Sequence, residues 1–375
     1  MANPKWNRDC RSFNPQYACD VLRAENYPDC APCKFYEPFK KKILIIKLGA
    51  MGDVLRTTPL LPLIKKKYPD CHITWLVKEE SIPLLRQNQG IDKTLPFKPE
   101  NLLRLKYEKF DVLINLEISP EATIASNLAQ AKEKYGYYFH EDGNPRNYNK
   151  QAEFYLNRVY SNQINKTNRK TYQEMMSEIA ELEYDKQPYS IQPTAKEYAE
   201  AFSRTHGLTS KDKIIGINIG SAGRWPSKAW HPDNLLELAK KLHKEKYKLI
   251  LLGGPEEQAS LPALHHKLVK ERIPAIMNNP ENTIQQFVSV MSLCKVIITS
   301  DSLALHIAIG LKKPTIALFF CTPPWEIEDY GVVKKLTSPL LEQYFYTDEY
   351  SEELVKSISP EQVFNQILEI EHAAN

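Results

Sequence analysis

The sequence lacks any apolar run that approaches the roughly 18 residues of a membrane-spanning helix. We therefore expect a chain that does not cross a bilayer. A secretory signal has an apolar stretch followed by small residues at a cleavage site. The first forty residues contain prolines and cysteines but no such stretch. Low-complexity segments and short repeats are also missing. Together these absences predict a folded protein of the cytoplasm.

An excess of charge of one sign is also missing. Lysine and arginine number 49 and aspartate and glutamate 46, which leaves a net charge of +3. This value is too small to indicate a nucleic-acid-binding protein, and we expect no nucleic-acid partner. Two basic clusters, Lys40–Lys42 and Lys65–Lys67, would suit an anionic glycolipid or the surface of the inner membrane. Runs of this kind are more often only solvated.

What is present is the composition and periodicity of an α/β protein. Of the 375 residues, 42% are hydrophobic and 25% are charged, and the length corresponds to about two domains. Short apolar runs alternate with helix-like stretches, which predicts mostly parallel sheets. The predicted strands are residues 43–46, 72–77, 111–116, 213–219, 248–252, 296–299 and 315–320.

The same patterns predict the limits of the domains. A single helix is expected over residues 53–68. Residues 139–170 are rich in asparagine, tyrosine and lysine with little periodicity, and we expect irregular structure there. The predicted domains are a cysteine-rich extension (1–40), an N-terminal domain (41–190), a C-terminal domain (191–345) and a C-terminal helix (346–375).

A glycine-containing loop follows the first predicted strand, with the sequence Gly49-Ala50-Met51-Gly52-Asp53. Its two glycines let the backbone turn and approach a ligand, and the following helix presents free N–H groups to polar or anionic atoms. The loop has neither the dinucleotide-binding glycine pattern nor the lysine signature of a phosphate-binding loop. Asp53 is either the N-cap of the helix or, in a cleft, a general base that deprotonates a hydroxyl group.

Further loops follow strands in the second half and carry groups suited to a phosphorylated ligand. The first offers close backbone approach, a hydroxyl and two positive charges. The second offers carboxylates for ribose hydroxyls, and the third a serine at a helix start with a histidine one turn later. Alternatively, these residues have only structural roles, as turn formers, helix caps and packing groups. The candidates are Gly220, Ser221, Arg224 and Lys228 in the first loop, Gly254 and Glu257 in the second, Asp301, Ser302 and His306 in the third, and Thr322 after the last strand.

With these features in this order, the chain resembles the heptosyltransferase-like glycosyltransferases of family 9 over roughly residues 42–324. The resemblance implies a GT-B architecture, in which two Rossmann-like domains face each other across a cleft. It implies that the C-terminal domain holds most of the donor and the N-terminal domain the acceptor, with Gly49–Gly52 as the acceptor-side loop. The implied partners are a nucleotide diphosphate sugar, ADP-heptose first, and a lipopolysaccharide-type or other glycolipid acceptor.

The resemblance also implies a mechanism. Transfer is expected to invert the anomeric carbon without a catalytic metal, because protein cations and helix N-termini neutralise the leaving diphosphate. The implied roles are Asp53 as general base, Ser221, Lys228 and Ser302 around the diphosphate, and Glu257 or Glu256 on the ribose.

Two positions depart from the family pattern. Leu303 stands where relatives often have glycine, and Phe320 lies in a stretch where they often have Phe-Gly-Pro-Thr. Larger side chains at these positions would change the backbone approach or the shape of the nucleotide pocket. Two alternatives stay open: a nucleotide-sugar epimerase of the same fold, and a non-catalytic protein that binds sugar nucleotides.

The seven cysteines are an odd number and cannot all form disulfides with one another. Cys10, Cys19, Cys30 and Cys33 precede the first predicted strand and can supply a complete tetrahedral metal shell. A structural zinc ion is favoured, and a four-cysteine iron–sulfur cluster uses the same number of ligands. The alternative is four unliganded thiols, because the spacing is irregular for a zinc ribbon.

Overall fold

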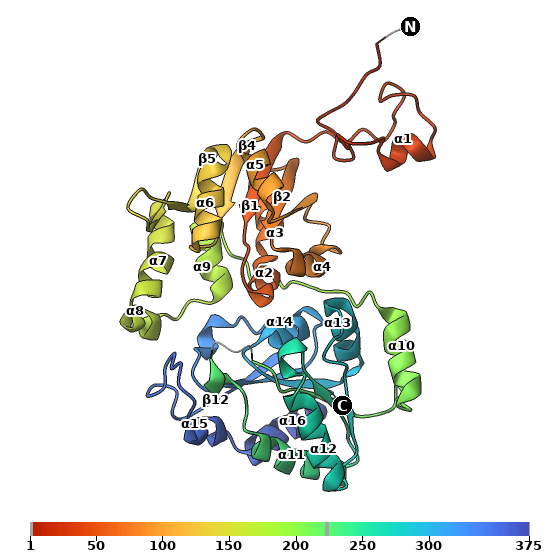
Figure 1. Cartoon of the computed structure of the whole chain (residues 1–375), viewed down its shortest axis with the longest axis vertical. Helices are drawn as coiled ribbons and strands as arrows, with labels where there is room; N and C mark the ends of the chain where they lie inside the picture. Colours follow the sequence, from red (N-terminus) through yellow and green to blue (C-terminus); the bar gives the residue numbers. More distant parts are fainter. Residues whose placement is uncertain (1–2, 222–224, 375) are drawn as a thin grey trace. The chain divides into compact units, whose positions relative to one another are not determined.

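The computed structural model describes residues 3–221 and 225–374. Their contacts divide the chain into two compact units, each with its own six-stranded sheet (Figure 1). This confirms the predicted α/β class with two parallel-sheet domains. The domain limits at residues 40, 190 and 345 stay predictions. The first unit comprises residues up to 50, 57–162 and 173–185, and the second comprises 51–56, 163–172 and the residues from 186 onward.

The sheet of the first unit has the order β3-β2-β1-β4-β5-β6. The inner strand β1 pairs in parallel with β2 and β4, so that Ile43 lies beside Ile73 and Val112. Residues 43–46 of β1 are all buried, as is usual for an inner strand of a parallel sheet. Only β6 runs antiparallel to its neighbour. The strands are β1 (Lys41–Ile46), β2 (Cys71–Val77), β3 (Lys93–Pro96), β4 (Lys109–Asn115), β5 (Gln130–Phe139) and β6 (Pro145–Asn147).

The sheet of the second unit repeats this order with its own strands, β12-β11-β10-β7-β8-β9, and all of its pairs are parallel. The carboxyl ends of parallel strands meet at one edge of a sheet, where α/β proteins bind their ligands. The loops that follow β7, β8, β10 and β11 therefore lie along the same edge. The strands are β7 (Ile214–Asn218), β8 (Lys248–Leu252), β9 (Ala275–Met277), β10 (Val296–Ser300), β11 (Thr315–Phe319) and β12 (Val333–Thr337).

Helices form most of the connections between strands. No helix within residues 3–221 and 225–374 combines the length and apolarity that a bilayer span requires. The helices are α1 (Asp20–Ala24), α2 (Met51–Thr57), α3 (Leu60–Lys67), α4 (Ile82–Leu85), α5 (Pro99–Leu105), α6 (Pro120–Leu128), α7 (Glu153–Tyr160), α8 (Asn162–Thr167), α9 (Tyr172–Ile179), α10 (Lys196–Thr205), α11 (Pro232–Lys244), α12 (Ser260–Lys270), α13 (Ile284–Leu293), α14 (Leu303–Gly310), α15 (Glu352–Lys356) and α16 (Pro360–Ala374), with short 3-10 turns η3 (Pro226–Lys228) and η4 (Pro255–Glu257) near the site.

The C-terminal helix belongs to the second unit. α16 packs along α11, and Figure 1 shows both helices beside α12. Val363 and Ile367 of α16 are fully buried in the same apolar cluster as Leu238 of α11. Helix α16 thus contributes to the core of this unit.

Two of the local expectations were wrong. The helix expected over 53–68 is two helices, α2 and α3, which Pro59 separates because proline lacks an N–H group and restricts the residue before it. Residues 139–170 are not irregular but contain β6, α7 and α8. Their periodicity was hidden because α7 buries only Leu156 and Arg158, a polar residue that a sequence pattern counts as exposed.

Candidate functional site

Two of the predicted loops of the second unit are joined by one amide. The side chain of Asn218, at the end of β7, donates to the carbonyl of Gly220 (2.7 Å) and to the hydroxyl groups of Thr299 (3.2 Å) and Ser302 (3.3 Å). β7 and β10 are adjacent parallel strands, so their following loops meet. The structure thus brings Gly220 and Ser302 together, and Asn218 is a residue that the sequence analysis missed.

Lys228 of η3 reaches the start of α14. Its Nζ lies 3.1 Å from Oδ2 of Asp301, and the two side chains are only 13% and 20% exposed. Burial alone would raise the pKa of Asp301, but the positive charges of Lys228 and Arg56 outweigh it and hold this pKa below its usual value. A cation is therefore held at the N-terminal end of a helix, where the backbone also favours anions.

Side chains on both sides of this lysine form hydrogen bonds with the C-terminal segment. The hydroxyl of Ser227 donates to the carbonyl of Glu349 (2.8 Å) and accepts the N–H of Ser351 (2.9 Å). The indole N–H of Trp230 donates to the carbonyl of Ile358 (2.9 Å). These hydrogen bonds hold η3 and the residues after it in place, so that the loop lysine has a defined position.

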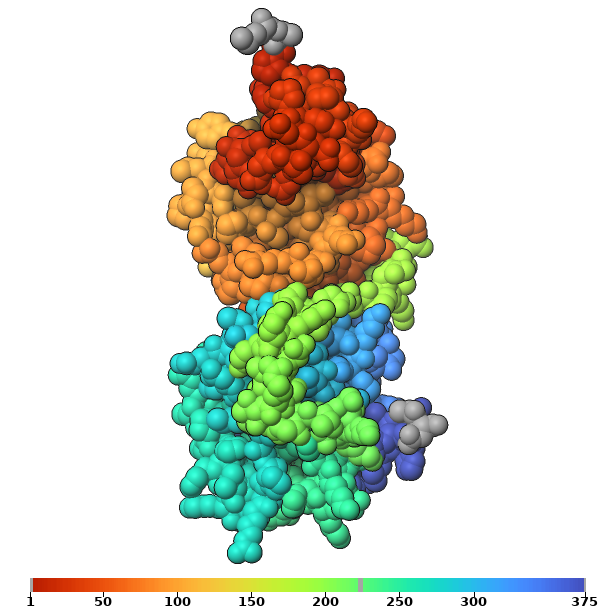
Figure 2. Space-filling model, turned by 90° about the vertical axis from the view of Figure 1, so that its right-hand side faces the viewer, coloured from red at the N-terminus to blue at the C-terminus, as the bar shows by residue number. Residues whose placement is uncertain are grey.

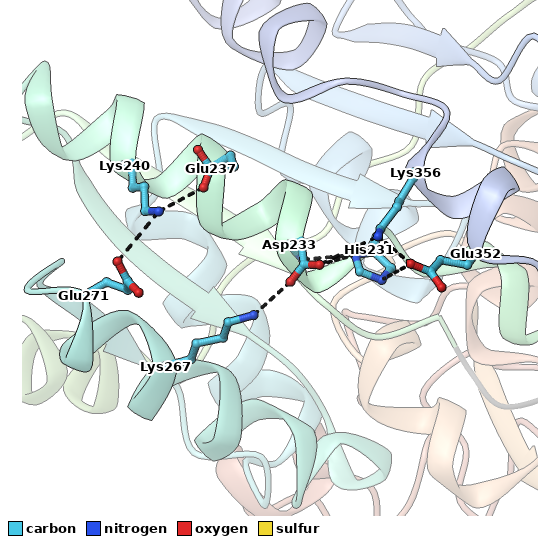
Figure 3. Close-up of polar contacts among 8 residues, drawn as sticks. All are labelled: His231, Asp233, Glu237, Lys240, Lys267, Glu271, Glu352 and Lys356. Carbon is cyan, nitrogen blue, oxygen red and sulfur yellow. Dashed lines mark hydrogen bonds and ion pairs between the residues drawn. The ribbon is translucent and has the colours of Figure 1, made fainter.

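A surface network of ion pairs continues from this loop (Figure 3). His231 accepts the N–H of Asp233 (3.1 Å) at the start of α11, and its ring lies 3.9 Å from Glu352 of α15. Asp233 also binds Lys267 of α12 (2.9 Å) and lies 3.8 Å from Lys356 of α15. The network connects three helices, although each exposed pair adds little stability.

Residues 51–56 belong to the second unit and carry Asp53. Because α2 begins at Met51, Asp53 lies within the first turn and is not the N-cap. Its Oδ1 is 2.8 Å from Nη2 of Arg56, and the Arg56 guanidinium lies over the ring of Tyr172 at 3.7 Å. Arg56 was not predicted, although its position three residues after Asp53 on a helix was a signal that could have found it.

Gly52 makes room for His306. A Cβ atom added to Gly52 would lie 2.6 Å from Cδ2 of the His306 ring. Burial lowers the pKa of His306 to about 3, and Arg56 acts in the same direction, whereas Asp301 and Asp53 oppose the shift. His306 is therefore a neutral ring at neutral pH.

The buried neutral His306 makes stability depend on pH. Its pKa is about 3 in the folded chain, against the ordinary histidine value of 6.5, so the unfolded chain takes up the proton first. Stability is present above pH 6.5 and is lost as the pH falls towards 3. Between pH 7 and pH 5 we expect a loss of about 2 kcal/mol from this residue.

Urea unfolding at the two pH values checks this expectation. His306→Gln should remove about 2 kcal/mol of the pH dependence. His243→Gln changes an exposed histidine of α11 and serves as the control. Equal pH dependence in the wild-type chain and in His306→Gln would show that His306 is not held neutral.

Glu257 lies against the glycines of two loops. Its carboxylate accepts the N–H of Gly254 (2.8 Å), and a Cβ atom added to Gly220 would lie 2.5 Å from its Cδ. Burial raises the pKa of Glu257 above its usual value. The structure thus brings Gly220, Gly254 and Glu257 together, and the proposed contact of Glu257 with ribose stays a prediction.

In the first unit, the amides of the loop after β1 already bind an internal anion. Oε2 of Glu117 accepts the N–H groups of Leu48 and Gly49, both at 2.8 Å, and lies 3.5 Å from Nζ of Lys47. Burial opposes ionisation, but Lys47 and the two amides hold the pKa of Glu117 below its usual value. Glu117 follows β4, the strand beside β1, and this adjacency was the missed signal. Ala50 ends the part of the loop that belongs to this unit.

The remaining candidates are less closely connected. Thr322 is buried, and its hydroxyl has no hydrogen-bond partner among the described residues. Phe320 is 1% exposed, and its ring packs within the apolar core. Leu303 is the first residue of α14 and is partly exposed. Ser221 is partly buried, and Arg224 lies outside the described residues.

The four N-terminal cysteines, Cys10, Cys19, Cys30 and Cys33, lie in the first unit before β1 and are free and half-buried. Within residues 3–221 and 225–374, no three histidine, cysteine, aspartate or glutamate side chains are arranged to hold a metal ion. Zinc or iron–sulfur binding by these cysteines stays a prediction.

Comparisons with known proteins identify the family of the chain. The family model described as glycosyltransferase family 9 (heptosyltransferase) matches residues 102–347. Lipopolysaccharide heptosyltransferase 1 of Campylobacter coli is 24% identical over 305 residues, which cover 76% of this chain and 85% of the relative.

Solved structures are similar over most of the chain. A family 9 glycosyltransferase from Veillonella parvula has a TM-score of 0.69 at 22% identity, covering 89% of this chain and 98% of that one. The E. coli ADP-heptose lipopolysaccharide heptosyltransferase II has a TM-score of 0.64 at 20% identity, covering 88% and 98%. These similarities show the fold, and the family model spans well over half of the chain. The chain belongs to glycosyltransferase family 9, the heptosyltransferase family.

Proposed function

We propose that this glycosyltransferase moves heptose from ADP-heptose to a lipopolysaccharide core or a related glycolipid acceptor, with inversion at the anomeric carbon. ADP-heptose and lipopolysaccharide appear in the names of its relatives. One observation from the chain itself carries the proposal: residues 51–56, with Asp53, form part of the same unit as the Lys228–Asp301 pair. The charge of Asp53 acts on His306, and that of Arg56 acts on Asp301. These two effects support a shared electrostatic environment for the proposed base and the proposed diphosphate site.

In the proposed step, an acceptor hydroxyl attacks the anomeric carbon of the donor. The new C–O bond forms as the bond from that carbon to the diphosphate breaks, and ADP leaves with the bonding electrons. Asp53 takes the hydroxyl proton. Lys228 and the amides at the start of α14 stabilise the charge that develops on the diphosphate. Ser221, Ser302, Arg224 and Thr322 complete the proposed donor site, and Glu257 accepts ribose hydroxyl groups.

Product analysis tests the proposal and separates it from the two alternatives. The full chain is incubated with ADP-heptose and a heptose-deficient lipopolysaccharide core. We expect ADP and heptosylated acceptor in equal amounts, with an inverted anomeric configuration by NMR. Conversion of the nucleotide sugar without acceptor would indicate an epimerase, and tight ADP binding without turnover over a broad screen of donors and acceptors would indicate a non-catalytic protein.

The proposed acceptor implies work at the cytoplasmic face of the inner membrane, and the structure distinguishes the two basic clusters. Each lysine of Lys40–Lys42 pairs with a carboxylate, from Asp70, Glu133 and Glu108 respectively. In the second cluster, Lys65 and Lys67 of α3 donate to backbone carbonyls, and Lys67 also lies over the rings of Tyr68 and Tyr135. None of these uncharged partners neutralises the charge of the lysines. We therefore assign contact with anionic headgroups to Lys65–Lys67.

Sedimentation with lipid vesicles tests this assignment. The triple change of Lys65, Lys66 and Lys67 to glutamine should lower affinity for anionic vesicles about tenfold or more, since each basic residue near such a surface contributes about 1 kcal/mol. The same change at Lys240, Lys241 and Lys244 of α11 removes equal charge elsewhere and should change binding less. Binding that does not depend on anionic lipid content would contradict the assignment.

A further inference from the structure

The segment that precedes β1 has almost no apolar core of its own. Among residues 3–40, Leu22 is the only buried apolar residue. Regular structure is limited to the five residues of α1 and a single bridge between Cys10 and Pro38. A piece of chain this small usually needs a covalent or metal cross-link to hold a fixed shape.

Residues near the two ends of this segment, which is red in Figure 2, nevertheless contact each other and the rest of their unit. Backbone hydrogen bonds join Arg11 to Glu37 (2.9 Å) and Phe39 to Asp9 (2.9 Å), which brings its two ends together. The Arg11 side chain also pairs with Asp92 of the first unit at 2.5 Å. These polar contacts stabilise the ends of the segment but not its middle.

All four N-terminal cysteines line one cavity in the middle of this segment, and its volume is about 370 Å³. They come from different parts of the segment, and the N–H of Cys33 donates to the carbonyl of Cys30 (3.3 Å) in a tight turn. Much of the remaining wall is aromatic, including Phe13 and Tyr27. Four thiols around one largely apolar space are the ligand set of a structural metal centre.

The chemistry of the lining selects the class of ligand. Four thiolates complete the shell of a tetrahedral zinc ion or hold a four-cysteine iron–sulfur cluster. Neither centre needs a further protein ligand. Arg8 also lines the cavity, and a neighbouring cation stabilises thiolates.

We propose that Cys10, Cys19, Cys30 and Cys33 bind one thiolate-held metal centre that cross-links residues 3–40. No three of these or other described acidic, histidine or cysteine side chains are arranged to hold a metal ion in the present conformation. Binding therefore requires the four sulfur atoms to approach one another within their shared cavity. Little regular structure surrounds these cysteines, so loops can move to bring the sulfur atoms together without repacking a core. The proposal does not depend on the transferase mechanism.

Metal analysis of the full chain tests the proposal. The chain is produced with both zinc and iron supplied, purified without oxygen, and assayed for zinc, iron and acid-labile sulfide. About one zinc per chain supports a zinc centre, and about two or about four irons with equal sulfide support a cluster. Less than about one-tenth of a centre per chain, with four titratable N-terminal thiols or with a disulfide among them, would overturn the proposal.

Matched variants locate the centre. The double change Cys30→Ser and Cys33→Ser should remove the metal, while Cys71→Ala, which removes a buried thiol of β2, should retain it. The same double change should also speed proteolytic cleavage within residues 3–40, because metal binding and folding are coupled. Circular dichroism and thermal melting show whether both sheets stay folded. Equal metal content in the double variant and the wild-type chain would overturn the assignment.

Discussion

Replacing Asp53 with asparagine is expected to lower kcat for heptosyl transfer about 1,000-fold, within the range that a general base contributes. The amide keeps the shape of the carboxylate but cannot accept the hydroxyl proton. Asparagine can still accept a hydrogen bond from Arg56 through Oδ1, the atom that lies 2.8 Å from the guanidinium. Affinity for ADP should change little, because Asp53 is assigned to the acceptor and not to the donor. Steady-state kinetics and calorimetric titration with ADP measure the two quantities.

A matched control exists in the first unit. Asp111 pairs with Lys132 at 2.7 Å and is 24% exposed, close to the 2.8 Å and 29% of Asp53 in its pair with Arg56. Asp111→Asn should leave kcat within a few-fold of the wild-type value. Turnover close to wild type in Asp53→Asn, with ADP affinity and melting temperature unchanged, would contradict the base role.

Lys228→Gln is expected to lower kcat/KM for the donor about 100- to 1,000-fold, since it removes a preorganised cation from the leaving diphosphate. Lys228 also forms an ion pair with Asp301, so its loss would also change the residues at the start of α14. Asp301→Asn separates the two effects, because it breaks the ion pair but keeps the cation. A smaller loss in Asp301→Asn than in Lys228→Gln is the expected result, and equal losses would show that Lys228 only positions Asp301.

A separate group of ion pairs at α11 supplies the control for this lysine. Lys240 pairs with Glu237 (2.9 Å) and Glu271 (3.7 Å) and is 42% exposed (Figure 3). Lys240→Gln removes the same charge from the same unit, away from the site loops. We expect kcat/KM within a few-fold of wild type and little change in the free energy of unfolding, because exposed ion pairs add little stability.

The inner strands could be predicted from the sequence, but strands near the sheet edges could not. All seven predicted runs are strands, and they include the central β1 and β7, where continuous apolar residues reflect burial on both faces. Residues 130–134 of β5 are mostly polar and lack an apolar run, and β9 has only three residues. β12, with the sequence Val-Lys-Lys-Leu-Thr, is an edge strand with half of its pairing surface open. Such strands depend on their neighbours and leave a weak signal.

The site shows a similar division. Asp53 and Lys228 could be singled out because each follows a strand in a short motif. Arg56, Asn218 and Glu117 were missed because their roles depend on a partner from another position. Glu117, for example, binds amides 68 and 69 residues away in the chain. That contact follows from the pairing of β1 with β4, which periodicity alone does not specify.

A crystal structure of the full chain with ADP tests the central claim most directly. We predict that the diphosphate lies within hydrogen-bond distance, about 3 Å, of Lys228 Nζ and of the backbone at Ser302. Asp53 should then face the place where the sugar would continue from the diphosphate. A nucleotide bound elsewhere, or an Asp53 carboxylate directed away from the diphosphate, would contradict the proposed mechanism.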